Sequence, residues 1–352
     1  MSLESFGFKR VGSFYNRPLF KVGAPTPLIG HIAFGIIDRG TNVVQIRPTT
    51  LCPYSCVFCS VDAGPFSKWR QAEFIVDTEW LYRHAIEVAK YKGGKSLEAL
   101  IDGVGEPLTH SDIVRLIKLL KDSGLYDRVA IDTRGGLLTK EIIIELEKAG
   151  LDRINLSIDS TDPTQAKELT GAKSYDVAQV LELVAWTLEN TKIDVILTPV
   201  VIPGVNEKEM IKIIEWAKRH KAGEKSSWPS GVLIQKYEVH RYGRKIKNVR
   251  PWSWSKFYEW LAELERTTGY RLIVSSKEIG IESRPQLPKP FKKGDVILGI
   301  VLGPGWHKGE YLVVDRGFRR LIAVFPAREL SPGESLRVKI EEDADNIYVA
   351  TV

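Results

Sequence analysis

Three cysteines within eight positions are the residues of this sequence whose types and spacing could do chemistry. Cys52, Cys56 and Cys59 follow the spacing Cys-x3-Cys-x2-Cys, and the chain of 352 residues has no other cysteine. Cubane iron–sulfur clusters are normally held by four cysteine thiolates. Three thiolates leave one iron open to a ligand that is not protein. The motif therefore predicts a reactive [4Fe-4S] cluster, with Cys52, Cys56 and Cys59 as its ligands and as the catalytic residues.

Two other uses of these cysteines fit the sequence less well. A structural zinc site takes four ligands in a closed tetrahedron, and the nearest histidines, His31 and His84, lie over twenty residues from the motif. A disulfide framework is disfavoured because three is an odd number and small secreted scaffolds carry many more cysteines. Under the zinc alternative, the chain would be a non-catalytic RNA-binding protein whose metal ion only stabilises the fold.

The cysteine spacing, with Phe58 directly before the third cysteine, resembles the signature of the radical S-adenosylmethionine (SAM) superfamily. The resemblance implies that the open iron binds SAM, and that an electron from the cluster cleaves SAM to a 5′-deoxyadenosyl radical that abstracts hydrogen from a substrate. It implies SAM as a second cofactor and an electron donor such as ferredoxin or flavodoxin. In such enzymes the protein binds and orients the cofactors that carry the chemistry.

The elements that must position these residues alternate as in repeated βαβ units. Strands are predicted at residues 43–48, 98–102, 128–132, 152–158, 193–200 and 231–238. Helices are predicted at residues 79–91, 111–123, 139–149, 175–190, 206–220 and 253–268. Six units are fewer than the eight that close a full barrel. The fold class predicted is α/β, an open (β/α)6 partial TIM barrel followed by a small all-β barrel.

Polar residues follow several of these strands, where parallel barrels bind their ligands. Gly105, Glu106 and Pro107 follow the second strand and resemble the family's Gly-Gly-Glu-Pro element, which holds the SAM amino group, although Gly-Glu-Pro is also compatible with a plain turn. Asp159 is a candidate SAM contact and equally a candidate cap for the following helix, and Asn206 is expected to cap the next one. The resemblance implies further cofactor contacts from Phe58, Thr133, Ser157, Val201 and Gln235.

A basic stretch follows the sixth strand. Residues 236–250 hold six Lys or Arg against the single acidic residue Glu238, with tyrosines and nearby tryptophans interleaved. Cationic groups beside aromatic rings suit a polyanion with exposed bases, while such a run is also compatible with a merely solvated surface. The expected RNA contacts in this stretch are Lys236, Arg241, Arg244, Lys245 and Lys247.

The last sixty residues switch to short strands, predicted at 295–302, 310–315, 320–325, 335–341 and 346–351, which favour a small barrel of OB-like type. The segment 332–340 resembles the TRAM domain, an RNA-binding barrel. From Pro285 onward there are 10 Lys or Arg and 9 Asp or Glu, so any basic surface must lie on one face. The expected RNA contacts here are Lys292, Lys293, Arg319 and Arg320, and the alternative is a barrel that only acts as a lid.

These observations predict four segments: an N-terminal extension (1–42), a radical SAM partial barrel (43–282), a proline-containing linker (283–291) and a TRAM-like barrel (292–352). The resemblance is to an archaeal-type enzyme that modifies RNA, either tRNA or rRNA. The alternative substrate is a small molecule, lipid precursor or peptide. Neither a membrane span nor a signal peptide is recognisable, so a cytoplasmic location without membrane partners is expected. With no further cysteine, a second cysteine-ligated cluster is excluded.

Overall fold

The computed structural model describes residues 3–352, which form two compact units. Unit 1 takes in the chain up to Cys52 together with Ser67–Asp127 and Ser283–Val352, and unit 2 takes in Pro53–Phe66 and Arg128–Glu282. The units divide the chain differently from the four predicted segments, whose boundaries stay predictions. The mixed α/β partial barrel itself is confirmed, with three of its strands in unit 1 and the rest in unit 2.

In unit 1, strands β4 (Val43–Arg47) and β6 (Glu98–Ile101) pair in parallel, as a βαβ unit requires. Strand β3 (Gly35–Asp38) pairs antiparallel with β4. Helix α1 (Thr78–Tyr91) begins after its N-cap residue Asp77, whose side chain accepts a hydrogen bond from the backbone N–H of Trp80 in the first turn. Helix α2 (Ile113–Asp122) follows β6 and buries one apolar face.

An N-terminal ribbon in unit 1 was not predicted from the sequence. Strands β1 (Phe8–Phe14) and β2 (Arg17–Val22) pair antiparallel, and β2 also pairs in parallel with β5 (Glu73–Val76). Rings from the three strands pack together, with centroids of Phe8 and Phe20 4.8 Å apart. The ribbon gives the residues before the partial barrel a core of their own, where the sequence indicated only an extension.

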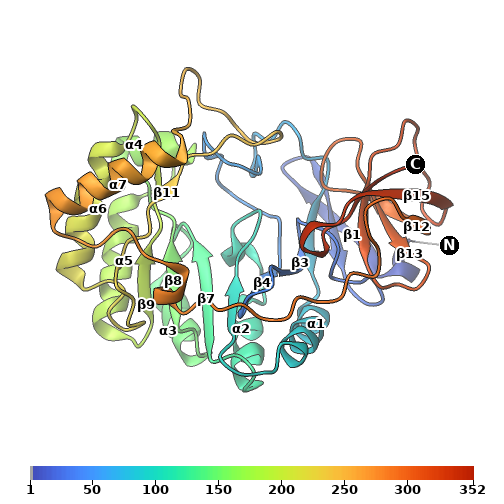
Figure 1. Cartoon of the computed structure of the whole chain (residues 1–352), viewed down its shortest axis with the longest axis horizontal. Helices are drawn as coiled ribbons and strands as arrows, with labels where there is room; N and C mark the ends of the chain where they lie inside the picture. The colour runs from blue at the N-terminus through green and yellow to red at the C-terminus, as the bar shows by residue number, and fades with distance from the viewer. Residues whose placement is uncertain (1–2) are drawn as a thin grey trace. The chain divides into compact units, whose positions relative to one another are not determined.

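The C-terminal residues of unit 1 form a closed five-stranded barrel, in the order β12-β13-β14-β16-β15, drawn in orange to red in Figure 1. Its strands are β12 (Val296–Pro304), β13 (Tyr311–Asp315), β14 (Leu321–Val324), β15 (Ser335–Glu342) and β16 (Val349–Thr351). All five predicted strands are present: β15 alternates buried and exposed side chains, whereas β13 and β14 are short apolar runs bounded by turn residues.

The proline-containing segment that precedes this barrel is fastened to the rest of unit 1. The carboxylate of Asp38 accepts a hydrogen bond from the Leu287 amide at 2.6 Å and pairs with the Lys92 ammonium at 2.6 Å. Lys92 also donates to the Pro285 carbonyl at 3.2 Å. Both charged side chains are fully buried, so this strap is part of the folded unit.

In unit 2, strands β7 (Arg128–Thr133), β8 (Arg153–Leu156) and β9 (Asp194–Leu197) pair in parallel. The helices are α3 (Lys140–Lys148), α4 (Pro163–Thr170), α5 (Val177–Asn190), α6 (Glu207–His220) and α7 (Trp254–Thr268). Figure 1 shows α3, α5 and α6 on one side of these three strands. Because β7, β8 and β9 are parallel, their carboxyl ends lie at one edge of the sheet of unit 2.

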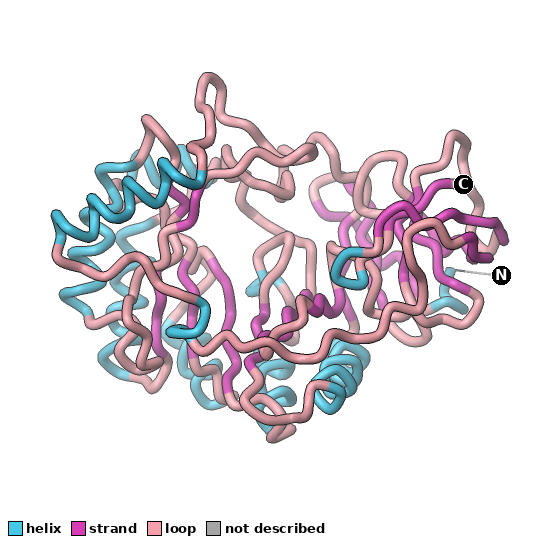
Figure 2. The backbone as a smooth tube through the Cα atoms, in the orientation of Figure 1, coloured by secondary structure: helices cyan, strands magenta, loops and turns pink. Residues whose placement is uncertain are grey.

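Three features of unit 2 differ from the predicted elements. The strand expected at 193–200 divides into β9 and β10 (Val200–Val201), and the strand expected at 231–238 contracts to β11 (Gln235–Lys236), which pairs with β10. Helix α4 was not predicted, because its sequence is polar and has a weak apolar stripe. A long loop follows β11 and leads to α7, as Figure 2 shows.

Candidate cofactor site

In unit 1, the residues that enter the cysteine motif lie directly against the Gly-Glu-Pro turn. The Glu106 amide donates to the Leu51 carbonyl at 2.7 Å. A Cβ at Gly105 would lie 2.3 Å from that same carbonyl oxygen, so only glycine fits there. Glu106, Pro107 and Cys52 are all buried. The turn predicted to hold SAM is therefore fixed to the segment that carries the first cysteine.

The remaining cysteine loop belongs to unit 2 and is held to the end of α4. Backbone amides of Ser55 and Val57 donate to carbonyls of Thr170 and Leu169 at 2.9 and 3.0 Å. The loop then turns at Gly64, whose φ is +92° and where a Cβ would lie 1.6 Å from the Tyr54 carbonyl oxygen. These contacts give the loop one defined path between Cys56 and the turn.

A backbone amide is directed at one of the predicted ligand sulfurs. The Ala63 N–H donates to the Sγ of Cys59 at 3.2 Å. Hydrogen bonds of this kind stabilise negative charge on sulfur and tune the potentials of iron–sulfur clusters. The contact fits a sulfur that serves as a thiolate ligand.

Arg244 fastens the basic loop of unit 2 to this cysteine loop. Its Nε lies 3.0 Å from a carboxylate oxygen of Asp62, and its terminal nitrogens donate to the Cys56 carbonyl at 2.9 Å and to the Ala63 carbonyl. The Arg244 amide also donates to the Cys59 carbonyl at 2.8 Å. The sequence predicted Arg244 as an RNA contact, but its donors are committed to the cysteine loop, so we assign it a structural role there.

A second guanidinium, that of Arg134, lies beside the aromatic residue of the cysteine motif. Arg134 forms an ion pair with Asp159 at 2.7 Å and lies over the ring of Phe58, 5.6 Å from its centroid. It also donates to the carbonyl of Ser157 at 3.3 Å. Arg134 was not among the site residues predicted from the sequence. The strand-end residues of β7 and β8 thus converge on the aromatic residue of the cysteine motif.

The Cys56 thiol is buried and lies near charged groups of both signs, which change its pKa in opposite directions. Burial raises the pKa of the Cys56 thiol to about 11, while Arg134 and Arg244 act to lower it. A thiolate at this buried position therefore needs a bound cation or metal to be favoured. In unit 2, the sulfurs of Cys56 and Cys59, an N–H···S bond and two flanking guanidiniums fit part of the surroundings of an anionic iron–sulfur cluster, whose third predicted ligand, Cys52, belongs to unit 1. Among residues 3–352, no set of three His, Cys, Asp or Glu side chains is gathered as for a single metal ion.

The other predicted cofactor contacts differ in burial. Thr133 is buried and accepts a hydrogen bond from Gly135, and Ser157 is half-buried. Val201 is fully buried in β10, whereas Gln235 is exposed and does not share the buried environment of Tyr237. Their contacts with SAM stay predictions.

The structure corrects one expectation about helix caps and confirms the position of the other. Asp159 does not cap α4, because the cap is Asp162, while the Asp159 carboxylate accepts from the Val200 amide at 2.9 Å. Asn206 is the N-cap residue of α6, as expected, but its side chain makes no capping hydrogen bond. It donates instead to the carbonyls of Asp159 and Val200 at 2.8 and 3.0 Å.

The nine residues predicted to contact RNA fall into two groups. Arg241, Lys245, Lys247, Lys292, Lys293 and Arg319 are exposed. The Lys236 ammonium is paired with Glu238 at 2.6 Å and its side chain is only 5% exposed. Arg320 donates to the carbonyl of Pro288 at 2.9 Å. With Arg244, these two residues serve the fold of their own units.

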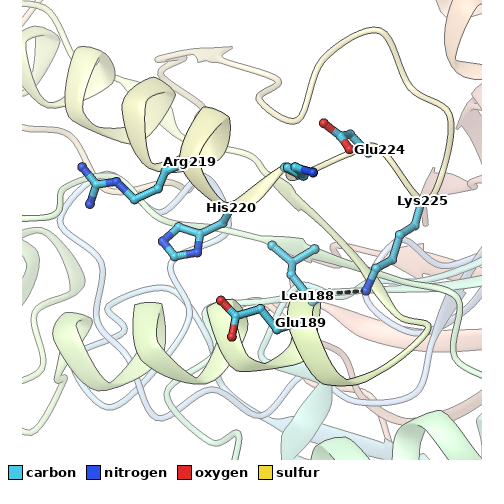
Figure 3. Close-up of a pocket in the computed structure, with 7 residues that line it drawn as sticks. Leu188, Glu189, Arg219, His220, Glu224 and Lys225 are labelled. Carbon is cyan, nitrogen blue, oxygen red and sulfur yellow. Dashed lines mark hydrogen bonds between the residues drawn. The ribbon is translucent and has the colours of Figure 1, made fainter.

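Figure 3 shows a surface pocket of unit 2 whose lining includes none of the predicted site residues. It is formed by the C-terminal ends of α5 and α6 and the segment after α6, and its lining residues are Leu188, Glu189, Arg219, His220, Lys221, Glu224 and Lys225. The Lys225 ammonium donates to the Leu188 carbonyl at 2.5 Å. Because these helices end before β9 and β11 begin, the pocket is at the amino ends of the strands, opposite the predicted site.

Comparisons with known proteins identify the architecture. Residues 46–217 match the family model described as the radical SAM superfamily. Uncharacterized protein MJ0103 of Methanocaldococcus jannaschii is 34% identical over 95% of this chain and 80% of its own length. A GTP 3',8-cyclase of Alkaliphilus metalliredigens is 30% identical over 61% of this chain and 66% of its own length.

A solved structure has a similar fold. The FeFe-hydrogenase maturase HydG of Carboxydothermus hydrogenoformans matches 68% of this chain and 52% of its own chain, with a TM-score of 0.50 and 17% identity. Over the described residues, no helix is both long and apolar enough to cross a membrane.

Proposed function

We propose that this chain, in which residues 46–217 match the model of the radical SAM superfamily, is a radical SAM enzyme that uses a [4Fe-4S] cluster and SAM to modify RNA, either tRNA or rRNA. Cys52, Cys56 and Cys59 would hold the cluster, and Gly105 and Glu106 would hold SAM. When bound, these cofactors supply reductive cleavage of SAM and abstraction of hydrogen from the substrate. Arg134 and Arg244 balance negative charge beside Cys56, and the N–H of Ala63 does so at Cys59.

An aromatic platform on unit 2 is the observation that supports RNA as the substrate. Trp254 and Tyr258, on the first turns of α7, are 57% and 51% exposed, and their rings are 6.0 Å apart with an angle of 30° between the planes. The Lys236 ammonium lies 4.8 Å from the Trp254 centroid. Large rings left in solvent beside cations are costly unless a partner covers them, and unpaired bases stack on such surfaces.

The loop before the platform supplies exposed positive charge. Arg241, Lys245, Lys247 and Arg250 are exposed, and Arg244 between them holds the loop to the cysteine loop of the same unit. A phosphate backbone that follows these cations would bring a nucleotide to the region of Cys56 and Cys59. This combination supports a single-stranded RNA segment as the substrate rather than a duplex, whose bases are already stacked.

Binding of a fluorescent single-stranded RNA to the reconstituted full chain tests the substrate class. Trp254→Ala should weaken binding by ~5-fold to 100-fold, the effect of losing about 1–3 kcal/mol of stacking, without changing the salt dependence. The double variant K245Q/K247Q should flatten the slope of log K against log salt by roughly 1.4, since each phosphate contact to a single strand contributes about 0.7.

Tyr91→Ala is the matched control, because Tyr91 is 48% exposed but lies at the end of α1 in unit 1. It should leave both the affinity and the slope unchanged. RNA binding that is undetectable, independent of salt, or equally weakened by Tyr91→Ala and Trp254→Ala would contradict RNA as the substrate.

A nucleotide is the second candidate substrate, favoured by the similarity to a GTP 3',8-cyclase, whose name states a reaction of GTP. The C-terminal barrel would then act as a lid. The two candidates separate when 5′-deoxyadenosine is measured under reducing conditions with RNA, with GTP or with neither. Stimulation by RNA, with a mass change in one nucleoside after digestion, supports the proposal, and stimulation by GTP alone supports the alternative.

A further inference from the structure

Two loops of unit 1 carry its predicted cofactor residues, and they are joined through their backbones. The first cofactor loop (48–52) ends at Cys52, and the second cofactor loop (102–107) contains Gly105 and Glu106. Besides the Glu106 amide, the Thr109 hydroxyl donates to the Leu51 carbonyl at 3.3 Å. The position of a SAM molecule held by one loop and by the iron of the other depends on how firmly these loops are joined.

A single buried guanidinium bridges the two cofactor loops. The terminal nitrogens of Arg70 donate to the Thr50 carbonyl at 2.8 Å and to the Val104 carbonyl. These carbonyls belong to the residues that come two before Cys52 and one before Gly105. The Arg70 side chain has no exposed surface, and its charge is paired with Glu73 at 3.1 Å. Two carbonyls bound by the two terminal nitrogens of one side chain suit the fork of a guanidinium and not the single ammonium of lysine.

The buried carboxylate of Glu73 fixes this guanidinium from the other side. Glu73 also pairs with Arg17 of β2 at 3.0 Å and accepts a hydrogen bond from the Thr50 hydroxyl at 2.5 Å. The same hydroxyl accepts from the Phe74 amide at 2.8 Å. These contacts restrict the conformations open to the Arg70 side chain. They also join the first cofactor loop to strand β5.

The C-terminal barrel covers the open face of Arg70 with the ring of Trp306. The guanidinium carbon lies 4.8 Å from the ring centroid, and Trp306 is 3% exposed. The Trp306 ring lies outside the buried cluster that forms the core of the barrel, and it packs on the guanidinium of Arg70 and on the ring of His307, whose centroid is 4.3 Å away. The neighbouring Gln71 amide donates to the Trp306 carbonyl at 2.9 Å, which fixes the turn between β12 and β13 at this place.

The turn that carries Trp306 is itself rigidly held. The Glu310 carboxylate accepts hydrogen bonds from the amides of Trp306 and His307 at 3.2 and 3.1 Å. It also pairs with the buried His31 at 2.7 Å, where the chain approaches β3. The barrel thus presents one aromatic ring from a fixed turn to one guanidinium.

We propose that Arg70 and Trp306 are positioning residues through which the C-terminal barrel holds the two cofactor loops together and sets the affinity for SAM. The barrel is then part of the cofactor site and not only a docking module for a substrate. This inference rests on the SAM cofactor of the family and is independent of whether the substrate is RNA.

Amide hydrogen exchange of the full chain without cofactors tests the coupling directly. Trp306→Ala should speed exchange of the amides of residues 49–52 and 103–106 by about tenfold, because the guanidinium loses the ring that shields it. Trp306→Phe, which keeps a ring, should restore slow exchange. Arg70→Lys, which keeps the charge but loses one of the two carbonyl contacts, should behave like Trp306→Ala.

SAM binding by the reconstituted chain gives the second readout. Trp306→Ala and Arg70→Lys should each raise the Kd for SAM by about tenfold and weaken the change that SAM causes in the electron paramagnetic resonance spectrum of the reduced cluster. Val338→Ala is the control, since Val338 is buried in the barrel core, opposite Ile297 at the start of β12, whereas Trp306 follows the end of β12. It should lower the Tm and leave the Kd for SAM unchanged.

Two results would overturn the proposal: exchange in the two loops that is the same in Trp306→Ala and the parent, or equal effects of Trp306→Ala and Val338→Ala. If the parent bound no SAM, the assignment of the cofactor would be wrong, and the exchange comparison would still decide whether the barrel holds the loops. Loss of RNA binding with normal exchange and SAM binding would count against the substrate class alone.

Discussion

At the scale of single residues, the charges around the cysteine motif come from positions that the sequence did not connect with it. Arg244 lies 188 residues after Cys56, in a run whose composition indicated a surface for polyanions. Arg134 follows β7, and its pairing with Asp159 depends on the register of β7 with β8. Residue types and spacing predicted the ligands, but the cations beside them depend on tertiary contacts that no local pattern encodes.

Replacing Arg244 with alanine should destabilise the cysteine loop. The substitution leaves the buried Asp62 carboxylate without its guanidinium, which costs about 3 kcal/mol, the lower end of the range for broken buried ion pairs. We expect a lower free energy of unfolding in urea and loss of iron from the reconstituted protein during gel filtration. Arg241→Ala removes an exposed arginine three residues away and should change neither. Equal iron retention in the two variants would contradict the role given to Arg244.

At the scale of elements, the cysteine loop depends on the turn at Gly64. Gly64 and Gly93 have nearly the same backbone angle, with φ of +92° and +94°, but a Cβ at Gly93 would meet nothing within 4 Å. Gly93→Ala should therefore cost only the strain of a left-handed residue, about 1–2 kcal/mol. Gly64→Ala adds a clash with the Tyr54 carbonyl and should cost about 3 kcal/mol or more.

The comparison of these two variants measures how much the cluster depends on the path of its loop. Iron bound per chain after anaerobic reconstitution should fall in Gly64→Ala and stay at the parent value in Gly93→Ala. A Gly64→Ala protein that unfolds at the parent urea concentration and binds the same iron would show that the loop does not need this turn.

The turn after β8 is held to α6 by the carboxylate of Glu209. One of its oxygens accepts from the Thr161 amide at 2.7 Å and from the hydroxyls of Ser160 and Thr161 at 3.1 and 2.8 Å. Burial opposes ionisation, but these donors and Lys212 lower the pKa of Glu209 from 4.5 to about 2. Because the folded pKa is the lower one, the ionised carboxylate stabilises the fold above pH 4.5, and this stabilisation is lost as the pH falls toward 2.

Glu209→Gln should reveal that dependence. At neutral pH the variant should be less stable than the parent by about 1–3 kcal/mol, since hydrogen bonds to a charged group are replaced by those of an amide. The difference in unfolding free energy, measured by urea denaturation, should be constant above about pH 5 and shrink between pH 4.5 and 2. A difference that grows as the pH falls over that interval would contradict the assignment.

The elements themselves were largely predictable, and the exceptions have physical causes. Asp194–Leu197 is buried on both faces and Val43–Arg47 is rich in β-branched residues with one face fully buried, so both runs are recognisable as strands of a covered parallel sheet. The ribbon of β1 and β2 lacks that signal because one face of β1 is polar and exposed. Helix α4 depends on its cap at Asp162 and on Pro163 in its first turn, which a search for apolar stripes does not register.

At the scale of the whole molecule, the sequence predicted the partial barrel and the closed C-terminal barrel, but not how the second contributes to the first. Trp306 and Arg70 are separated by more than two hundred residues, and neither belongs to a motif. The strap at Asp38 and the turn at Glu310 make the barrel part of unit 1. Removing the barrel would therefore disturb the cofactor loops as well as any RNA surface, so point variants of the full chain are the informative tests.

The central claim is that Cys52, Cys56 and Cys59 would hold a [4Fe-4S] cluster that supplies, when bound and reduced, reductive cleavage of SAM. It is tested most directly by reconstituting the full chain anaerobically, adding SAM and a strong reductant, and measuring 5′-deoxyadenosine together with the metal content. The account predicts about four irons per chain, formation of 5′-deoxyadenosine, and loss of both in Cys56→Ala. Zinc in place of iron, or four irons with SAM left intact, would contradict it.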